Sequence, residues 1–479
     1  RYTVTDHRNI LLVSSDQHNP RAAGYAGHRL VQTPHLDALA ERGTEFTSAY
    51  CSSPICVPSR ASLATGRYVH EIETWDNSAP YAGEPVSWGH HLRDAGYQVT
   101  SVGKLHYRDG DCDTGIDDQR LAMHVHGKGD IKGVALRSSG QMHPPRTELS
   151  KNLLATGPGE SEYTIYDRAV GDESVRFLER APDQPWMLFA SFVTPHFPLI
   201  VPDEFFDLYR DEDIPDPEPW SEAWQHPAIE VFRDSFGLIR DLTADEHRRA
   251  LRSYWALTSF MDAQVGRVLD ALQAAGHLDD TLVIYTSDHG ESAGAHGQWF
   301  KHLMNEESVR VPLILAGDGI SAGGKITTPV SQIDLTPTML DWAGVQRSVS
   351  ATPHAVSLLD MDALAGMDRP VISEYHANGS LSASVMMRHG RYKYIEYVGY
   401  RPQLFDLEAD PYEREDLSRS PTHAEVMMAC ARRLREICDP EVIDAAAKAD
   451  QDRRVDEVGG LEAALAHTVN HTPPPKLDD

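Results

Sequence analysis

The sequence predicts an α/β fold with a large mixed, mostly parallel sheet flanked by helices, followed by a smaller C-terminal unit. Apolar runs alternate with amphipathic stretches through the first half of the chain, as strands and helices do in α/β proteins. The pattern changes near Val371, where apolar segments follow one another across short turns, which indicates a smaller antiparallel sheet with a helix. We therefore expect a first unit of residues 1–370 and a smaller α+β unit of residues 371–479 that ends in an extended polar tail.

Apolar runs with the length of buried strands occur throughout the first unit. In open α/β sheets, ligands bind beyond the carboxyl ends of the strands, because loops and helix N-termini converge there. Polar motifs directly follow several of the runs, so we expect the functional site at that edge of the sheet. The predicted strands are residues 9–14, 97–102, 186–193, 281–286 and 311–315.

Helices are predicted where capping residues bound an amphipathic stretch. One runs from Thr33, with a proline in its first turn, to Gly43; others are predicted at Trp88 to Ala95 and at Tyr254 to Ala275. In the second unit we predict strands at 385–388, 391–397 and 403–407, with a helix near 424–437.

The formal net charge of −28 on 479 residues argues against nucleic acid and anionic membranes as partners. No apolar run is long enough to span a membrane. The five cysteines are odd in number and lack zinc-finger spacing, and residues 1–9 lack the pattern of a secretion signal. We expect a cytoplasmic protein; the periplasm is the alternative if an N-terminal signal has been removed.

The most specific motif is the run from Cys56 to Arg67, CVPSRASLATGR. Proline suits the first turn of a helix, and Arg60 places a guanidinium fork, suited to an oxyanion, one turn from the cysteine. A lone cysteine would be an ordinary buried residue, but this run resembles the signature of type I sulfatases in the alkaline phosphatase superfamily. The resemblance implies that a maturation enzyme oxidises Cys56 to formylglycine (3-oxoalanine), whose hydrated aldehyde is the nucleophile, in a catalytic domain of residues 1–370.

Asp16 and the pair Asp288-His289 follow two predicted strands, where a buried carboxylate needs a counter-charge or a metal. A turn cap is the alternative for Asp16 alone. The resemblance implies that Asp16, Asp288, His289 and modified Cys56 bind one divalent metal ion. The combination of Asp16-Gln17 with Asp288-His289 is more similar to choline sulfatases and phosphonate monoester hydrolases than to most arylsulfatases. Calcium is favoured by the resemblance, and manganese is the alternative because of the imidazole.

Further motifs supply groups for a substrate anion. Lys104 and His106 alternate with Leu105, so an extended segment would point both to one face, although a solvated loop is the alternative. His196 stands in a Pro-His-x-Pro segment and is suited to proton transfer. The resemblance assigns catalysis to Cys56, Arg60, Lys104, His106, His196 and Lys301, and substrate contacts to Gln17 and Asn77.

The implied reaction is hydrolysis of a small anionic sulfate ester through a covalent sulfate hemiacetal, which breaks when His106 removes a proton. Hydrolysis of phosphonate monoesters or phosphodiesters at the same site is the nearer alternative, and a non-catalytic anion-binding relative is another. Ser292 in GESAG matches the G-x-S-x-G motif of serine hydrolases, but it lies several residues beyond the predicted strand. Trp75 and Tyr375 are candidates for a quaternary-ammonium cage or for the core. We also expect a homo-oligomer.

Overall fold

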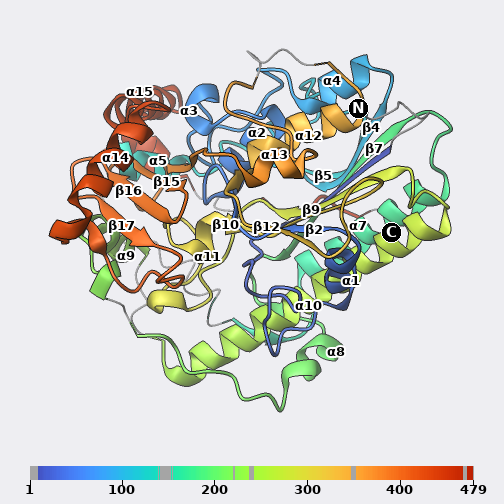
Figure 1. The fold of residues 1–479 in the computed structure, drawn as a ribbon, viewed down its shortest axis with the longest axis horizontal. Helices are drawn as coiled ribbons and strands as arrows, with labels where there is room; N and C mark the ends of the chain where they lie inside the picture. The colour runs from blue at the N-terminus through green and yellow to red at the C-terminus, as the bar shows by residue number, and fades with distance from the viewer. Residues whose placement is uncertain are drawn as a thin grey trace.

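The computed structural model describes residues 9–138, 140, 153, 155–219, 222–236, 242–346, 352–467 and 472–477. An eight-stranded sheet crosses the centre of the molecule in the order β12-β2-β11-β9-β1-β7-β4-β5 (Figure 1). Strand β11 is antiparallel to both of its neighbours, and the other pairs are parallel, which confirms the mixed, mostly parallel sheet. Its strands are β1 (Asn9–Asp16), β2 (Thr44–Phe46), β4 (Gln98–Lys104), β5 (Asp118–Met123), β7 (Trp186–Pro195), β9 (Thr281–Ser287), β11 (Leu313–Ala316) and β12 (Gly324–Ile326).

The strand predicted at residues 311–315 is divided in the structure. Pro312, which has no N–H to donate, separates β10 (Arg310–Val311) from β11. Strand β10 joins a three-stranded sheet with β3 (Ala49–Tyr50) and β13 (Val330–Ser331). The other four predicted strands correspond to β1, β4, β7 and β9.

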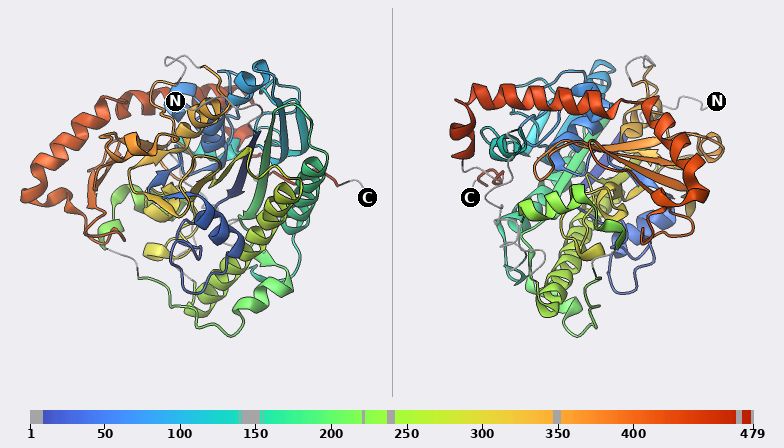
Figure 2. Two further views of the ribbon diagram at one scale, coloured as in Figure 1. Left: turned by 45° about the vertical axis from the view of Figure 1, so that its right-hand side comes forward. Right: turned by 90° about the vertical axis from the view of Figure 1, so that its left-hand side faces the viewer.

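The central strands contribute alternate side chains to two cores. Leu11 and Val13 of β1 enter one core, and Ile10 and Leu12 enter the other. Both faces of the sheet are therefore covered, which explains why its central strands are apolar throughout (Figure 2). The first face packs against α1 (Pro34–Arg42), α7 (Glu162–Glu179) and α10 (Ala244–Ala274), and the second against α2 (Cys56–Thr65), α4 (Trp88–Asp94) and α12 (Leu335–Trp342).

Helix α10 begins ten residues before the predicted start at Tyr254. Thr243 and Glu246 form a capping box, in which each side chain accepts a hydrogen bond from the other residue's backbone N–H. Helix α7 was not predicted from the sequence, although Ser161 caps it. The remaining elements are β6 (Gly157–Pro158), β8 (Ile200–Val201), α3 (Val69–Ile72), α5 (Ile131–Ser138), α8 (Asp203–Phe206), α9 (Pro227–Phe236), α11 (Glu306–Val309) and α13 (Met361–Ala365).

The C-terminal part forms the expected antiparallel sheet, β14 (Val371–Tyr375), β15 (Ser384–His389), β16 (Tyr392–Tyr397) and β17 (Gln403–Asp406). The predicted hairpin is β15–β16, and α14 (Ala424–Arg435) packs on the outer face of the sheet. On the inner face, Met386 and Ile395 share a core with Ala61 of α2. The small sheet therefore packs against the side of the molecule that carries α2.

The residues after Asp439 were expected to form an extended tail, and the structure differs there. They form α15 (Pro440–Glu457), because the Asp439 carboxylate caps the first turn by accepting from two backbone N–H groups, and α16 (Leu461–Leu465) follows. Helix α15 packs on α5, where the guanidinium of Arg137 is buried and pairs with Asp444 at 2.8 Å. This ion pair therefore connects α15 to α5.

Among the residues that the structure describes, none of the helices combines the length and the apolar character needed to cross a membrane.

We predict that Asp444→Ala destabilises the protein by about 3 kcal/mol, because it leaves the Arg137 guanidinium buried without its counter-charge. Glu441→Ala on the same helix is the control: it removes an exposed pair with Arg435 and should cost less than about 0.5 kcal/mol. Urea denaturation of both variants measures the difference. Equal effects would mean that the buried pair does not stabilise the contact between α15 and α5.

Candidate active site

The predicted site residues converge at the carboxyl edge of the central sheet. Strands β9, β1, β7 and β4 are adjacent and parallel, so the segments that follow them meet at one edge. The residues brought together there are Asp16 at the end of β1, Lys104 at the end of β4, His196 after β7, and Asp288 and His289 after β9. Cys56, the first residue of α2, completes the group.

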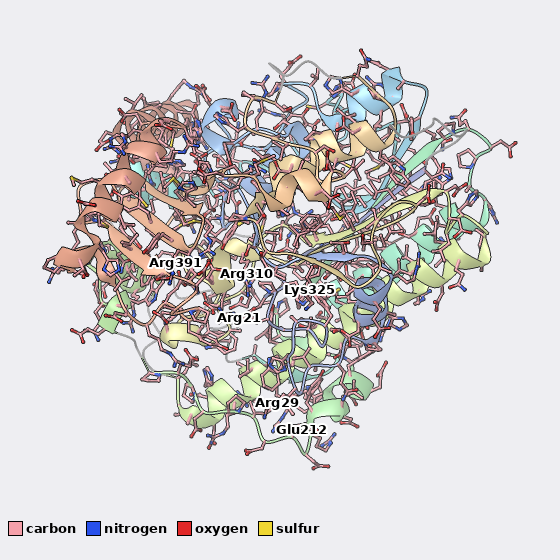
Figure 3. The ribbon with its side chains drawn as sticks, in the orientation of Figure 1. Arg21, Arg29, Glu212, Arg310, Lys325 and Arg391 are labelled. Atoms are coloured by element: carbon pink, nitrogen blue, oxygen red, sulfur yellow. The ribbon has the colours of Figure 1, made fainter. Side chains whose placement is uncertain are left out.

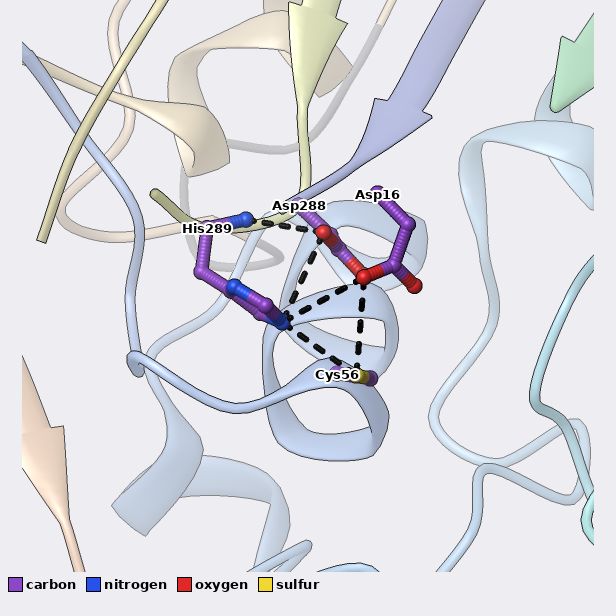
Figure 4. A group of neighbouring side chains, drawn as sticks. All are labelled: Asp16, Cys56, Asp288 and His289. Atoms are coloured by element: carbon purple, nitrogen blue, oxygen red, sulfur yellow. Dashed lines mark hydrogen bonds and ion pairs between the residues drawn. The ribbon is translucent and has the colours of Figure 1, made fainter. Parts of the chain in front are cut away.

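Asp16, Cys56, Asp288 and His289 form a compact, fully buried cluster (Figure 4). The Cys56 Sγ lies 3.2 Å from His289 Nε2 and 3.9 Å from Asp16 Oδ1. His289 Nε2 is 3.7 Å from an Oδ1 atom of each aspartate. One donor atom from each of the four residues lies within 4.8 Å of all the others, so one ion could contact all four.

Two glycines allow the backbone to bring these groups together. A Cβ at Gly290 would lie 2.0 Å from the carbonyl oxygen of Glu307, so only glycine fits directly after His289. Gly103 has a φ of 105°, and a Cβ there would lie 2.1 Å from the carbonyl oxygen of Ser191. Gly290 directly follows the Asp288-His289 pair, and Gly103 directly precedes Lys104. The close backbone approach at each position explains why glycine occupies it.

The position of Cys56 is set by the start of α2. Residue 55 is extended and the helix begins at the cysteine, so the thiol lies at the positive end of the helix. Asn77 Oδ1 accepts a hydrogen bond of 3.1 Å from Val57 N, which places Asn77 beside the cysteine. Although burial raises the pKa of the Cys56 thiol, the positive charges of Lys301 and Lys104 outweigh it, and the pKa is lowered.

Arg60 bridges the two aspartates. Its Nε donates to Asp288 Oδ2 at 2.8 Å, and its Nη2 donates to Asp16 Oδ2 at 3.3 Å. Its Nη1 donates to the carbonyl oxygen of Lys104 and to Ser191 Oγ. The sequence suggested an oxyanion as the partner of this guanidinium, whereas its donors point at protein acceptors. The geometry therefore favours a positioning role, with one oxygen of each aspartate left facing Cys56.

The chemistry of the cluster fits a divalent cation. Two carboxylates and an imidazole are common ligands of divalent ions, and their buried negative charges favour a cation. His289 Nδ1 is held at 3.0 Å by the carbonyl oxygen of Gly290, so Nε2 faces the aspartates, as expected for a ligand oriented by its second nitrogen. The residues that would hold the ion are therefore those the resemblance implied.

A second cluster of donor atoms, His296, Glu307 and Glu413, offers three donor residues rather than four. Protein cations already neutralise it, since Arg21 contacts Glu307 at 2.8 Å and Lys393 contacts Glu413 at 2.6 Å. Figure 3 labels Arg21 and also Arg310, whose Nε lies 3.6 Å from the neighbouring Glu306. The geometry indicates a buried ion-pair network between the small sheet and the loop after β9.

The two predicted anion-binding lysines contact adjacent residues, Asp16 and Gln17. Lys104 Nζ pairs with Asp16 and holds the pKa of that carboxyl well below its usual value, although burial alone would raise it. Lys301 Nζ donates to Gln17 Oε1 and lies 5.2 Å from the centre of the Phe197 ring. The two ammonium groups provide local positive charge in an acidic protein.

The two predicted histidines differ in their hydrogen bonding. His196 Nδ1 lies 2.7 Å from the carbonyl oxygen of Phe197, and its ring stacks on the Phe197 ring at 4.1 Å. His106 is buried, and neither of its ring nitrogens has a hydrogen-bond partner among the residues that the structure describes. Burial, reinforced by the charges of Lys104 and Arg60, lowers the pKa of His106 well below its usual value. A neutral imidazole free to accept a proton is what a general base requires.

Glu291 belongs to the site, although no signal in the sequence singled it out. Its Oε2 accepts a hydrogen bond from Gln17 Nε2, and its Oε1 accepts from the backbone N–H groups of Ala293 and Phe300. Burial raises the pKa of this carboxyl, and the N–H donors counteract the rise. Glu291 lies within GESAG, where the neighbouring serine is the residue that motif reading selects.

The remaining candidates lie in less reactive surroundings. Ser292 Oγ is buried and accepts from Asn305 Nδ2 at 3.3 Å, an amide that cannot act as a base. Trp75 and Tyr375 are 2% and 1% exposed and pack within hydrophobic cores, and the Tyr375 hydroxyl donates to the carbonyl oxygen of Asn378. Their burial favours the core interpretation of both aromatics.

Known proteins resemble this chain along most of its length. A family described as Sulfatase matches residues 8–345, and one described as N-sulphoglucosamine sulphohydrolase, C-terminal, matches residues 294–439. The chain is 34% identical to a choline-sulfatase of Rhizobium meliloti (strain 1021), over 99% of this chain and 96% of the relative. It is 30% identical to arylsulfatase K of Homo sapiens, over 85% of this chain and 78% of that protein.

Solved structures share the fold. A phosphonate monoester hydrolase of Agrobacterium radiobacter superposes with a TM-score of 0.72 at 24% sequence identity. The superposition covers 93% of this chain and 96% of that one, so both the central sheet and the C-terminal part are included.

We predict that the purified protein retains one divalent ion per chain and that His289→Ala lowers its affinity at least about tenfold, because a ligand is removed. Glu307→Gln, in the neutralised second cluster, is the matched control and should leave the metal content unchanged. Elemental analysis after dialysis against a weak chelator measures both. Loss of metal in the control but not in His289→Ala would assign the ion to the other cluster.

Proposed function

This chain belongs to the sulfatase family of sulfuric ester hydrolases, and we propose the reaction that it catalyses. It hydrolyses small anionic sulfate monoesters, and its nucleophile is formylglycine made from Cys56. The observation that carries the proposal is the surroundings of Cys56 Sγ, which lies within 4 Å of His289 and Asp16. A structural cysteine has no need of these neighbours. The proposed divalent ion is calcium, with manganese as the alternative because of the imidazole.

In the first step, the hydrated aldehyde at position 56 offers one hydroxyl as the nucleophile, whose proton moves toward Asp288. The hydroxyl oxygen bonds to sulfur while the bond from sulfur to the ester oxygen breaks. A bound divalent ion would lower the pKa of the hydroxyl and offset the charge of the sulfate group. Lys104 and Lys301 hold the sulfate oxygens, and His196 or Lys301 protonates the departing oxygen.

The second step releases sulfate without attack of water on sulfur. His106 takes the proton of the second hydroxyl, the carbon–oxygen bond to the sulfate breaks, and the aldehyde forms again. The bonding electrons leave with the sulfate. An ordinary serine or cysteine has no second hydroxyl and would remain sulfated, which is the chemical reason for the modification. The unpartnered ring nitrogens of His106 support this role.

The leaving group of the substrate is proposed from the relatives. One of them is named choline-sulfatase, so choline sulfate is the first ester to test. Hydrolysis of phosphonate monoesters or phosphodiesters is the second candidate, since Gln17 and the Asp-His pair also resemble those enzymes, and a singly charged phosphodiester is similar to a sulfate monoester in charge and shape. A formylglycine-forming maturation enzyme, a cytoplasmic location and a homo-oligomer remain parts of the proposal.

Kinetics on choline sulfate, an aryl sulfate and a phosphonate monoester test the proposed function. We expect the highest kcat/KM on one of the two sulfates. Phosphonate turnover equal to or better than sulfate turnover would reverse the order of the two candidate functions. Absence of turnover on all three, in protein whose Cys56 is fully converted, would favour an anion-binding relative.

Conversion of Cys56 is predicted for protein made with a maturation enzyme. The mass of its peptide should fall by the difference between a CH2SH and a CHO side chain, and Cys56→Ala should lower kcat at least about 1000-fold. Ser292→Ala is the control and should keep activity within about twofold, because the hydrogen-bond partner of its Oγ is an amide, which cannot act as a base. The opposite pattern would support a serine hydrolase.

His106→Ala is predicted to stop the reaction after the first step, because the second hydroxyl keeps its proton. We expect a burst of one alcohol per active site and a stable sulfate adduct on the peptide that contains residue 56. Rapid-quench kinetics and peptide mass spectrometry measure the two. Slow steady turnover without an adduct would show that His106 acts before or during sulfur transfer.

A further inference from the structure

Glu291, Gln17 and Lys301 form a hydrogen-bonded chain that ends at the site. Gln17 lies between the other two: its Nε2 donates to Glu291 Oε2, and its Oε1 accepts from Lys301 Nζ. All three side chains are nearly inaccessible to solvent, with exposures of 2% for Glu291, 1% for Gln17 and 5% for Lys301. Water therefore competes little with these contacts.

The orientation of the Gln17 amide follows from its neighbours. An ammonium group can only donate hydrogen bonds, and a carboxylate can only accept them. The amide must therefore present its oxygen to Lys301 and its NH2 group to Glu291. Gln17 itself has a left-handed backbone, with a φ of 68°, and its N–H donates to Asp288 Oδ1 at 3.2 Å, so its main chain is also held in place.

We propose that Glu291 is a positioning residue that sets the Gln17 amide so that its oxygen holds the Lys301 ammonium at the departing ester oxygen. The inference rests on the proposed function, in which that oxygen receives the bonding electrons and a proton. The buried carboxylate at position 291 accepts a hydrogen bond from the NH2 group of Gln17. Because that group is held there, the oxygen of the same amide faces Lys301.

The two oxygens of Glu291 have separate partners, which makes the proposal testable. Oε1 accepts from the backbone of Ala293 and Phe300 and supports the loop, whereas Oε2 accepts from Gln17 alone in the part of the chain that the structure describes. In Glu291→Gln, the amide oxygen can keep both backbone contacts while the NH2 group replaces Oε2. Gln17 must then turn its oxygen toward position 291 and its NH2 group toward Lys301, and two donors cannot bond.

The first experiment compares leaving groups. Glu291→Gln should lower kcat at least about tenfold more on choline sulfate, which leaves as a basic alkoxide, than on 4-nitrophenyl sulfate, which needs little protonation. KM should change little on either ester. Equal losses on the two esters would overturn the proposal.

Rescue by exchange is the second experiment. The double variant Gln17→Glu/Glu291→Gln should recover most of the lost turnover of choline sulfate, because the carboxylate at position 17 accepts from both the amide at position 291 and Lys301. A double variant no better than Glu291→Gln would contradict the proposed chain of contacts.

Asp262→Asn is the matched control for loss of a buried carboxylate. Asp262 is buried and also accepts two backbone N–H groups, those of His35 and Leu36, and neither of these residues belongs to the site. It should lower the turnover of the two esters by the same factor. A larger loss on choline sulfate in this variant would mean that the leaving-group effect reports general destabilisation.

A readout without turnover separates this inference from the proposed function. Brief treatment with acetic anhydride should acetylate Lys301 several-fold faster in Glu291→Gln than in the unaltered protein, and the double variant should restore protection; mass spectrometry measures the extent. Unchanged Lys301 reactivity would overturn the positioning role, even in an active enzyme. Faster reactivity in a protein that hydrolyses no sulfate ester would support the positioning of Lys301 and refute the proposed function.

Discussion

The ion pairs of Arg60 with Asp16 and Asp288 hold the site together, because two buried carboxylates on adjacent parallel strands would otherwise repel each other. Arg60 uses one donor group on each carboxylate and the rest on β4 and β7, so it connects α2 to β1, β4 and β7 and to the residue that follows β9. Cys56 stands one turn earlier on the same helix. Because Arg60 and Cys56 lie on the same helix, the ion pairs of Arg60 also place the cysteine beside the two aspartates.

The site is a region of balanced charge in a strongly acidic protein. The chain has a formal net charge of −28, yet Lys104 and Lys301 approach Cys56 from different strands and loops. Burial itself lowers the pKa of His106, and the charges of Lys104 and Arg60 add to that effect. Burial would raise the pKa of Asp16, but the neighbouring positive charges, that of Lys104 first, hold it low. An anionic substrate would thus find positive charge where it is shielded from the acidic surface.

The C-terminal part supports the site from outside. Arg454 of α15 forms an ion pair with Asp76. The residue after Asp76 is Asn77, whose Oδ1 accepts a hydrogen bond from the backbone N–H of Val57 at the start of α2. The sequence indicated the small sheet because apolar segments separated by short turns are a local pattern. It missed α15 because that helix is polar on most of its surface and depends on the buried pair of Arg137 with Asp444.

By itself, the sequence determined the mixed sheet, the strand ends that bear Asp16 and Asp288, and the run around Cys56, because local spacing encodes strands, caps and motifs. Only the tertiary structure decided that Arg60 donates hydrogen bonds to two aspartates. It also decided that the Gln17 amide lies between Glu291 and Lys301. These pairings join residues 44 to 284 positions apart in the chain. Such contacts leave no periodic trace in the sequence, since each depends on how the strands align and on which buried charges must be compensated.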